Sequence, residues 1–132
     1  MPNYAGACLC GAVRFAVEGR LGEPLACHCG QCRRQSGHFP VASIARRADL
    51  NLLQADSLKW YRSSESARRG FCGTCGSFLF WDGGGEEIAV LLGSLDQPTG
   101  LTLAGHIFVD DKADYYDIQD DLPKFAGADQ PI

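Results

Sequence analysis

Phe71-Cys72-Gly73-Thr74-Cys75-Gly76 is the stretch that decides the fold, because its two glycines permit a tight turn around two cysteines. A turn of this kind is a metal knuckle, in which two thiolates come together and backbone N–H groups approach the sulfur atoms. A thioredoxin-type redox pair would instead open a helix after a strand, whereas Gly76 leads into an apolar run at 77–81 that is typical of a strand. We therefore interpret Cys72 and Cys75 as half of a metal site.

A second pair, Cys8 and Cys10, supplies the other half. Residues two apart at the entry to a strand project to one face, so these thiolates can converge on a single ion. Structural zinc takes four protein ligands, and joining the two pairs gives a closed site of Cys8, Cys10, Cys72 and Cys75. Any other partition of the seven cysteines wastes a ligand.

The remaining cysteines, Cys27, Cys29 and Cys32, form a cluster of three in Cys27-His28-Cys29-Gly30-Gln31-Cys32. This cluster is either an open zinc site or a second structural site completed by His28, His38 or another side chain. In an extended segment His28 would point away from the metal, so we expect it to flank the site. Without metal, the three thiols would be redox-active if a neighbouring charge lowered the pKa of one of them.

Three thiolates and Zn²⁺ carry a net charge of -1, which makes the metal a poor activator of water. A soft site of this kind favours a thiol as its fourth ligand and would hold that thiol deprotonated. The site therefore predicts sulfur chemistry. Arg33 and Arg34 follow the cluster directly and are candidates to bind a substrate carboxylate bidentately.

The length of 132 residues and the 45% hydrophobic content predict a single domain over residues 1–132. No apolar run approaches the roughly 20 residues that span a bilayer, and Met1 to Gly11 does not resemble a secretory signal. We therefore expect a cytoplasmic protein. Disulfides are rare in that compartment and seven is an odd number, so metal ligation is the better explanation of the cysteines.

Charge is unevenly distributed along the chain, whose formal net charge is -4. Residues 1–81 hold ten of the twelve Lys and Arg against five acids, whereas residues 82–132 hold two against eleven. Bound zinc and its thiolates would reduce the first half to about +2. Nucleic acid is therefore an improbable partner, because its binding normally needs a clustered basic patch.

Short strands account for most of the predicted structure. Alternation at 12–18 predicts a half-buried strand, and further short runs at 41–45, 50–53, 58–62, 77–81, 88–92 and 105–109 are separated by Gly, Asp, Asn or Pro. We expect Asp82 to Gly85 to form a hairpin loop. One short helix is predicted at Gly30 to Ser36, ended by Gly37 in the left-handed conformation.

These motifs resemble the glutathione-dependent formaldehyde-activating enzyme family, which includes centromere-protein-V-like proteins. The resemblance rests on Cys8-Leu9-Cys10-Gly11 before a strand, on 27–33 with Ser36 and Gly37, and on 71–76, with support from 93–96, 106–109 and 120–125. It implies a β-tent fold, which is mostly β and made of short antiparallel strands around cysteine knuckles. It also implies a structural zinc on the four-cysteine site and a second, catalytic-like zinc on the three-cysteine site.

Two functions follow from the sequence. The first, implied by the resemblance, is a zinc-dependent carbon-sulfur lyase that forms or cleaves S-hydroxymethylglutathione from glutathione and formaldehyde, with Cys27, Cys29 and Cys32 as the catalytic site. The second is a non-catalytic zinc module that binds a protein or a nucleic acid. They differ in whether the three-cysteine site holds metal and keeps an open position.

Overall fold

Two β-sheets make up most of the computed structural model, which describes residues 3–128. One sheet has three strands in the order β1-β2-β5, and the other has seven in the order β10-β3-β4-β9-β8-β7-β6. Neighbouring strands are antiparallel apart from β10 and β3, which are parallel. The strands are β1 (Asn3–Ala7), β2 (Arg14–Glu18), β3 (Leu25–Cys27), β4 (Val41–Arg46), β5 (Leu50–Gln54), β6 (Leu58–Arg62), β7 (Arg68–Cys72), β8 (Phe78–Asp82), β9 (Glu87–Leu91) and β10 (Gly105–Ile107).

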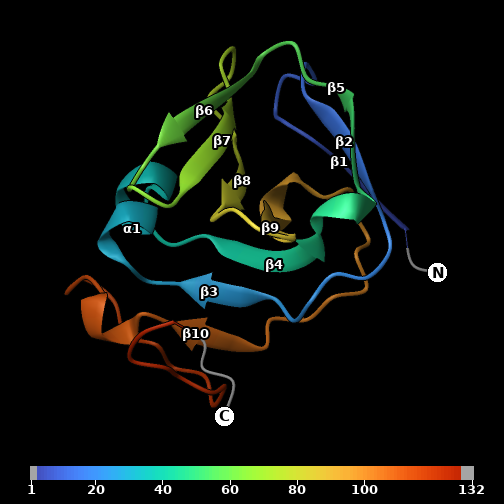
Figure 1. Ribbon diagram of the computed structural model, residues 1–132. Helices are drawn as coiled ribbons and strands as arrows, with labels where there is room; N and C mark the ends of the chain where they lie inside the picture. The colour runs from blue at the N-terminus through green and yellow to red at the C-terminus, as the bar shows by residue number, and fades with distance from the viewer. Residues whose placement is uncertain (1–2, 129–132) are drawn as a thin grey trace.

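The sheets lean together like the sides of a tent (Figure 1). Strands β6 and β7 rise on one side, β1, β2 and β5 rise on the other, and β4, β3 and β10 run across the base. The mostly β fold and its antiparallel strands confirm the fold class expected from the sequence. No helix within residues 3–128 is long and apolar enough to cross a membrane.

The core lies between the two sheets. In β2 the alternation predicted from the sequence buries Phe15 and Val17 and exposes Arg14 and Glu18. Phe15 packs edge-to-face on Phe80 of β8 at a centroid distance of 5.0 Å, which joins the three-stranded sheet to the seven-stranded one. Cys8 and Cys72 belong to the same buried cluster, so the four-cysteine site adjoins the core.

The helix α1 (Gly30–Ser36) begins and ends where the sequence predicts. Gly37 adopts φ 88°, and its N–H donates to the carbonyl of Arg33 at 2.9 Å, which ends the helix. Residues 3–128 also contain three short 3₁₀ helices: η1 (Arg47–Asp49), η2 (Leu92–Ser94) and η3 (Val109–Asp111). The predicted hairpin at 82–85 is also present, since β8 pairs with β9 across it.

The sequence analysis did not predict three of the observed strands, β1, β3 and β7. Their sequences, NYAGA, LAC and RRGFC, are short and lack a regular alternation, so pairing with neighbouring strands determines their conformation. The expectation that Cys8 and Cys10 enter a strand is wrong, because β2 begins only at Arg14. The two cysteines lie in a turn closed by the Gly11 N–H, which donates to the carbonyl of Cys8 at 3.1 Å.

Candidate metal centres

The four-cysteine site joins the two sheets. Its sulfur atoms, from Cys8, Cys10, Cys72 and Cys75, all lie within 4.8 Å of one another. Cys8 and Cys10 come from the turn after β1, whereas Cys72 ends β7 and Cys75 lies in the turn before β8. The pairing of the two cysteine pairs proposed from the sequence therefore agrees with the geometry.

The sulfur positions in this site fit a tetrahedral metal. The Sγ atom of Cys10 is 3.6 Å from that of Cys8 and 3.8 Å from that of Cys72. A tetrahedron with metal–sulfur bonds of about 2.3 Å places sulfurs about 3.8 Å apart. The separations thus suit a soft, tetrahedral ion such as zinc.

Neighbouring groups favour the thiolate forms of Cys72 and Cys75, whereas burial and the other thiols raise the pKa of Cys10 to about 11. The Ser57 hydroxyl lies 3.3 Å from the sulfur of Cys72, and its hydrogen bond lowers the pKa of that thiol to about 7. The Ser77 hydroxyl does the same for Cys75, whose pKa falls to about 5. Backbone N–H groups of Thr74 and Cys75 donate to the sulfur of Cys72 at 3.4 Å, as expected of a metal knuckle.

The three-cysteine site lies where β3 passes into α1. Cys27 ends β3, Cys29 is the N-cap of α1, and Cys32 lies in its first turn. The cap brings two ligands together, because the Cys29 sulfur accepts a hydrogen bond from the Cys32 backbone N–H at 3.3 Å. All three sulfurs lie within 4.8 Å of one another, and no His, Asp or Glu of residues 3–128 joins them as a fourth ligand.

The three thiols differ in pKa because they hydrogen-bond to one another. Hydrogen bonds from the thiols of Cys27 and Cys32 lower the pKa of Cys29, while the hydrogen bond to Cys29 raises the pKa of Cys27. Cys32 is buried, whereas Cys27 and Cys29 are half-buried. The three cysteines therefore differ both in pKa and in exposure.

His28 does not join the cysteines and instead starts a chain of hydrogen bonds. The Asp120 carboxylate can only accept, so Nε2–H of His106 donates to it at 2.8 Å, and Nδ1 of His106 accepts from Nε2–H of His28 at 2.9 Å. Nδ1 of His28 is then left to accept from the Tyr116 hydroxyl at 2.6 Å. Burial lowers the pKa of His28 to about 4, which keeps the ring neutral at pH 7. The chain ties the ligand segment to the C-terminal part of the fold.

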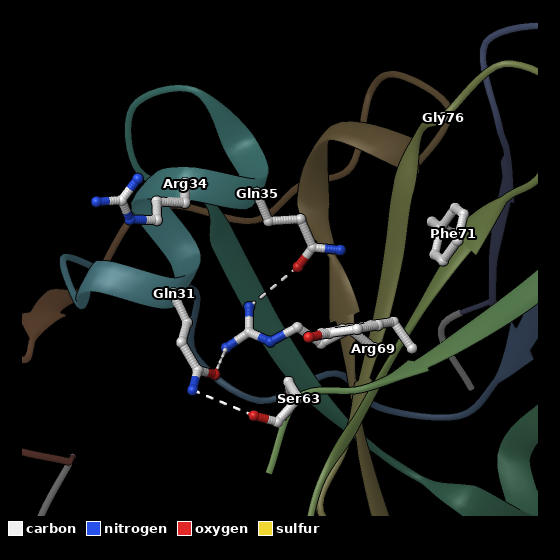
Figure 2. Close-up of a pocket in the computed structure, with 8 residues that line it drawn as sticks. Gln31, Arg34, Gln35, Ser63, Arg69, Phe71 and Gly76 are labelled. Carbon is white, nitrogen blue, oxygen red and sulfur yellow. Dashed lines mark hydrogen bonds between the residues drawn. The ribbon is translucent and has the colours of Figure 1, made fainter.

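A cavity of about 510 Å³ adjoins α1 beside Gln31 and Gln35 (Figure 2). Its wall carries polar side chains from α1 and β7, and its lining residues are Gln31, Arg34, Gln35, Tyr61, Ser63, Arg69, Phe71 and Gly76. Figure 2 shows the side chains of Gln31 and Gln35 converging on Arg69, while the guanidinium of Arg34 points away from them. The volume is within the range of small-molecule sites.

Arg33 and Arg34 received the same candidate role in the sequence analysis, but they lie on different sides of α1. Arg34 is exposed and lines the cavity, whereas Arg33 is half-buried and acts electrostatically on Tyr116. Arg69 and Tyr116 were missed by the sequence analysis. The pattern around them carries no signal for their role, because each reaches its site through contacts distant in sequence.

Comparisons with known proteins agree with this architecture. A family model described as glutathione-dependent formaldehyde-activating enzyme matches residues 3–111. A protein of Schizosaccharomyces pombe, named as an uncharacterized lyase, is 28% identical over 128 residues, which is 95% of this chain and 92% of the relative. The crystal structure of a Rhodobacter sphaeroides protein is similar with a TM-score of 0.63 and 29% identity, covering 77% of this chain and 98% of that one.

Proposed function

This chain belongs to the glutathione-dependent formaldehyde-activating enzyme family, and from that membership we propose that it forms or cleaves S-hydroxymethylglutathione as a zinc-dependent carbon-sulfur lyase. In the forming direction the thiol sulfur bonds to the formaldehyde carbon, the carbonyl electron pair moves to oxygen, and the thiol proton ends on that oxygen. Cleavage reverses these steps, so no oxidant or reductant is needed. The observation that carries the proposal is the three-cysteine site, which lacks a fourth ligand among the His, Cys, Asp and Glu of residues 3–128.

Zinc fits both cysteine groups by the chemistry of their donors. We assign a structural zinc to Cys8, Cys10, Cys72 and Cys75, and a second to Cys27, Cys29 and Cys32. Zinc held by three thiolates supplies a fourth coordination position and lowers the pKa of a thiol that occupies it. The protein's own part is to hold the three sulfurs together through the N-cap of α1 and to fix their segment through the hydrogen bonds of His28.

The cavity beside α1 is our candidate for the rest of the thiol substrate. Glutathione carries two carboxylates, and the exposed guanidinium of Arg34, which points away from Gln31 and Gln35, can bind one of them bidentately. The amides of Gln31 and Gln35 offer further hydrogen bonds to a peptide-like ligand. Arg33 instead acts on Tyr116, so we expect it to contribute less to carboxylate binding than Arg34.

We also propose that the protein works in a reducing compartment such as the cytoplasm. None of the seven cysteines forms a disulfide. Both metal groups need thiolates, and oxidation to disulfides would remove those ligands.

The proposal is tested with ¹³C-formaldehyde and glutathione, whose exchange with S-hydroxymethylglutathione is followed by NMR. The zinc-loaded protein is expected to raise the exchange rate above the spontaneous rate, and Cys29→Ser is expected to abolish the increase while keeping the far-UV circular dichroism of the fold. An increase that survives in Cys29→Ser would contradict the assigned site. Absence of any increase, together with salt-dependent binding of nucleic acid, would instead favour the non-catalytic module.

A further inference from the structure

Arg69 is a buried cation without a carboxylate. Its exposed fraction is 5%, and it is the one buried Lys or Arg among residues 3–128. No Asp or Glu in that part of the chain forms an ion pair with it. A buried charge is costly unless an opposite charge compensates it, so the counter-charge of Arg69 must be sought among its actual neighbours.

Three side chains of α1 contact the Arg69 guanidinium, and Figure 2 shows the two glutamines among them. Nη1 donates to Gln35 Oε1 at 3.1 Å and to the sulfur of Cys32 at 3.4 Å, and Nη2 donates to Gln31 Oε1 at 3.2 Å. Gln31 and Gln35 are four residues apart and therefore share one helix face. The face that carries a cysteine of the three-cysteine site thus also carries the groups that orient Arg69.

The two glutamines are neutral, so they do not compensate the positive charge of Arg69. Amide oxygens satisfy N–H donors but leave the positive charge uncompensated, whereas a glutamate at either position would neutralise it. Nε of Arg69 has no hydrogen-bond partner, so the guanidinium is not saturated by its surroundings. Among the hydrogen-bond partners of Arg69 within residues 3–128, the sulfur of Cys32 is the one that can carry a negative charge.

We propose that Arg69 is the counter-ion of the three-cysteine metal site, a positioning residue that offsets the net charge of -1 carried by three thiolates and a divalent ion. This inference rests on the proposed function, because it requires metal at Cys27, Cys29 and Cys32. Loading the site from neutral thiols adds that negative charge, and a guanidinium in contact with one sulfur favours the loaded state. Arg69 also links the two metal groups, since β7 carries Arg69 toward one end and Cys72 at the other.

The test compares Arg69→Met and Arg69→Lys with a matched control, Arg68→Met. Arg68 is the neighbouring residue on the same strand, but it pairs with Asp82 and lies over Trp60 at 3.9 Å, away from the cysteines. Each variant is loaded with zinc, equilibrated with a graded series of a competing chelator, and analysed for zinc per chain. Cobalt-loaded samples provide a second readout, because thiolate-to-cobalt absorption reports on the bonds to sulfur.

Arg69→Met is expected to lower the zinc affinity of one site about 10- to 100-fold, as is typical for loss of a group that supports metal ligands. The other zinc should keep its wild-type affinity, Arg69→Lys should restore part of the loss, and Arg68→Met should retain both ions. Equal affinities in wild type and Arg69→Met would overturn the inference, as would loss of both ions together, which would show that Arg69 serves the fold. A wild-type chain that binds one zinc would contradict the proposed function itself, and the inference with it.

Discussion

Loss of the four-cysteine site should destabilise the fold more than loss of the three-cysteine site. A metal held by Cys10 and Cys72 closes a loop of 62 residues, whereas one held by Cys27 and Cys32 closes a loop of only five. If a metal bridge restricts the unfolded chain as a covalent cross-link does, the longer loop corresponds to about 4 kcal/mol of stability. The shorter loop contributes about 2 kcal/mol less, because the cost of closure grows with the logarithm of loop length.

The perturbations are the double variants Cys72→Ser/Cys75→Ser and Cys27→Ser/Cys29→Ser, which remove two ligands each. The assay is unfolding by urea of zinc-loaded protein under reducing conditions, with zinc measured in the same samples. We expect the first variant to lose about 4 kcal/mol of unfolding free energy and the second about 2 kcal/mol or less. A strong chelator removes both metals, so it should lower the unfolding free energy of wild type at least to the level of Cys72→Ser/Cys75→Ser. Equal losses in the two variants, or a larger loss for Cys27→Ser/Cys29→Ser, would refute the assignment of the structural role to the site between the sheets.

Three further predictions concern the core, an ion pair and the cavity. Asp82→Asn removes a carboxylate whose pKa is lowered to about 2 by hydrogen bonds from two arginines, Arg47 first. The ionised carboxylate stabilises the fold above pH 4, and this stabilisation is lost as the pH falls toward 2. Asp82→Asn should therefore lower the free energy of unfolding by about 1–2 kcal/mol at pH 7 and by little at pH 2, as measured by urea unfolding at both pH values. Gly6→Ala would place a Cβ atom against the Phe15 ring and 2.8 Å from the carbonyl oxygen of Ser94, so it should lower the free energy of unfolding by about 1–3 kcal/mol, as measured by urea unfolding. Gly93→Ala, with open space at its Cβ, should not. Arg34→Met should raise the KM for glutathione about three- to tenfold with kcat unchanged, in keeping with one exposed charge-assisted hydrogen bond, and a fall in kcat alone would contradict its assignment to binding.

Much of the fold could be predicted from local signals. The helix at Gly30–Ser36 carries its own stop signal in Gly37 and formed where expected, although its cap by the Cys29 thiol was seen only in the structure. The alternation through Phe15 and Val17 likewise predicts a strand without any knowledge of its partners. In contrast, β7 starts with two arginines and contains Gly70, and it is a strand because β6 and β8 pair with it on both sides.

The cysteine groups were predictable for a similar reason, whereas their surroundings were not. Spacing along the chain and the number of ligands that a metal needs suffice to divide seven cysteines into four and three. Arg69 contacts Cys32 across 37 residues of sequence, and Tyr116 contacts His28 across 88, so only the packing of the fold places them there. The adjacency of Arg33 and Arg34 in the sequence also suggested a shared role that they do not have, because consecutive residues on a helix point in different directions.

The most direct test of the account is the zinc content per chain of protein purified under reducing conditions, measured by elemental analysis for wild type and Cys29→Ser. The account predicts two zinc ions per wild-type chain and one per Cys29→Ser chain. One zinc in both proteins would contradict it, because the three-cysteine site would then not be a metal site.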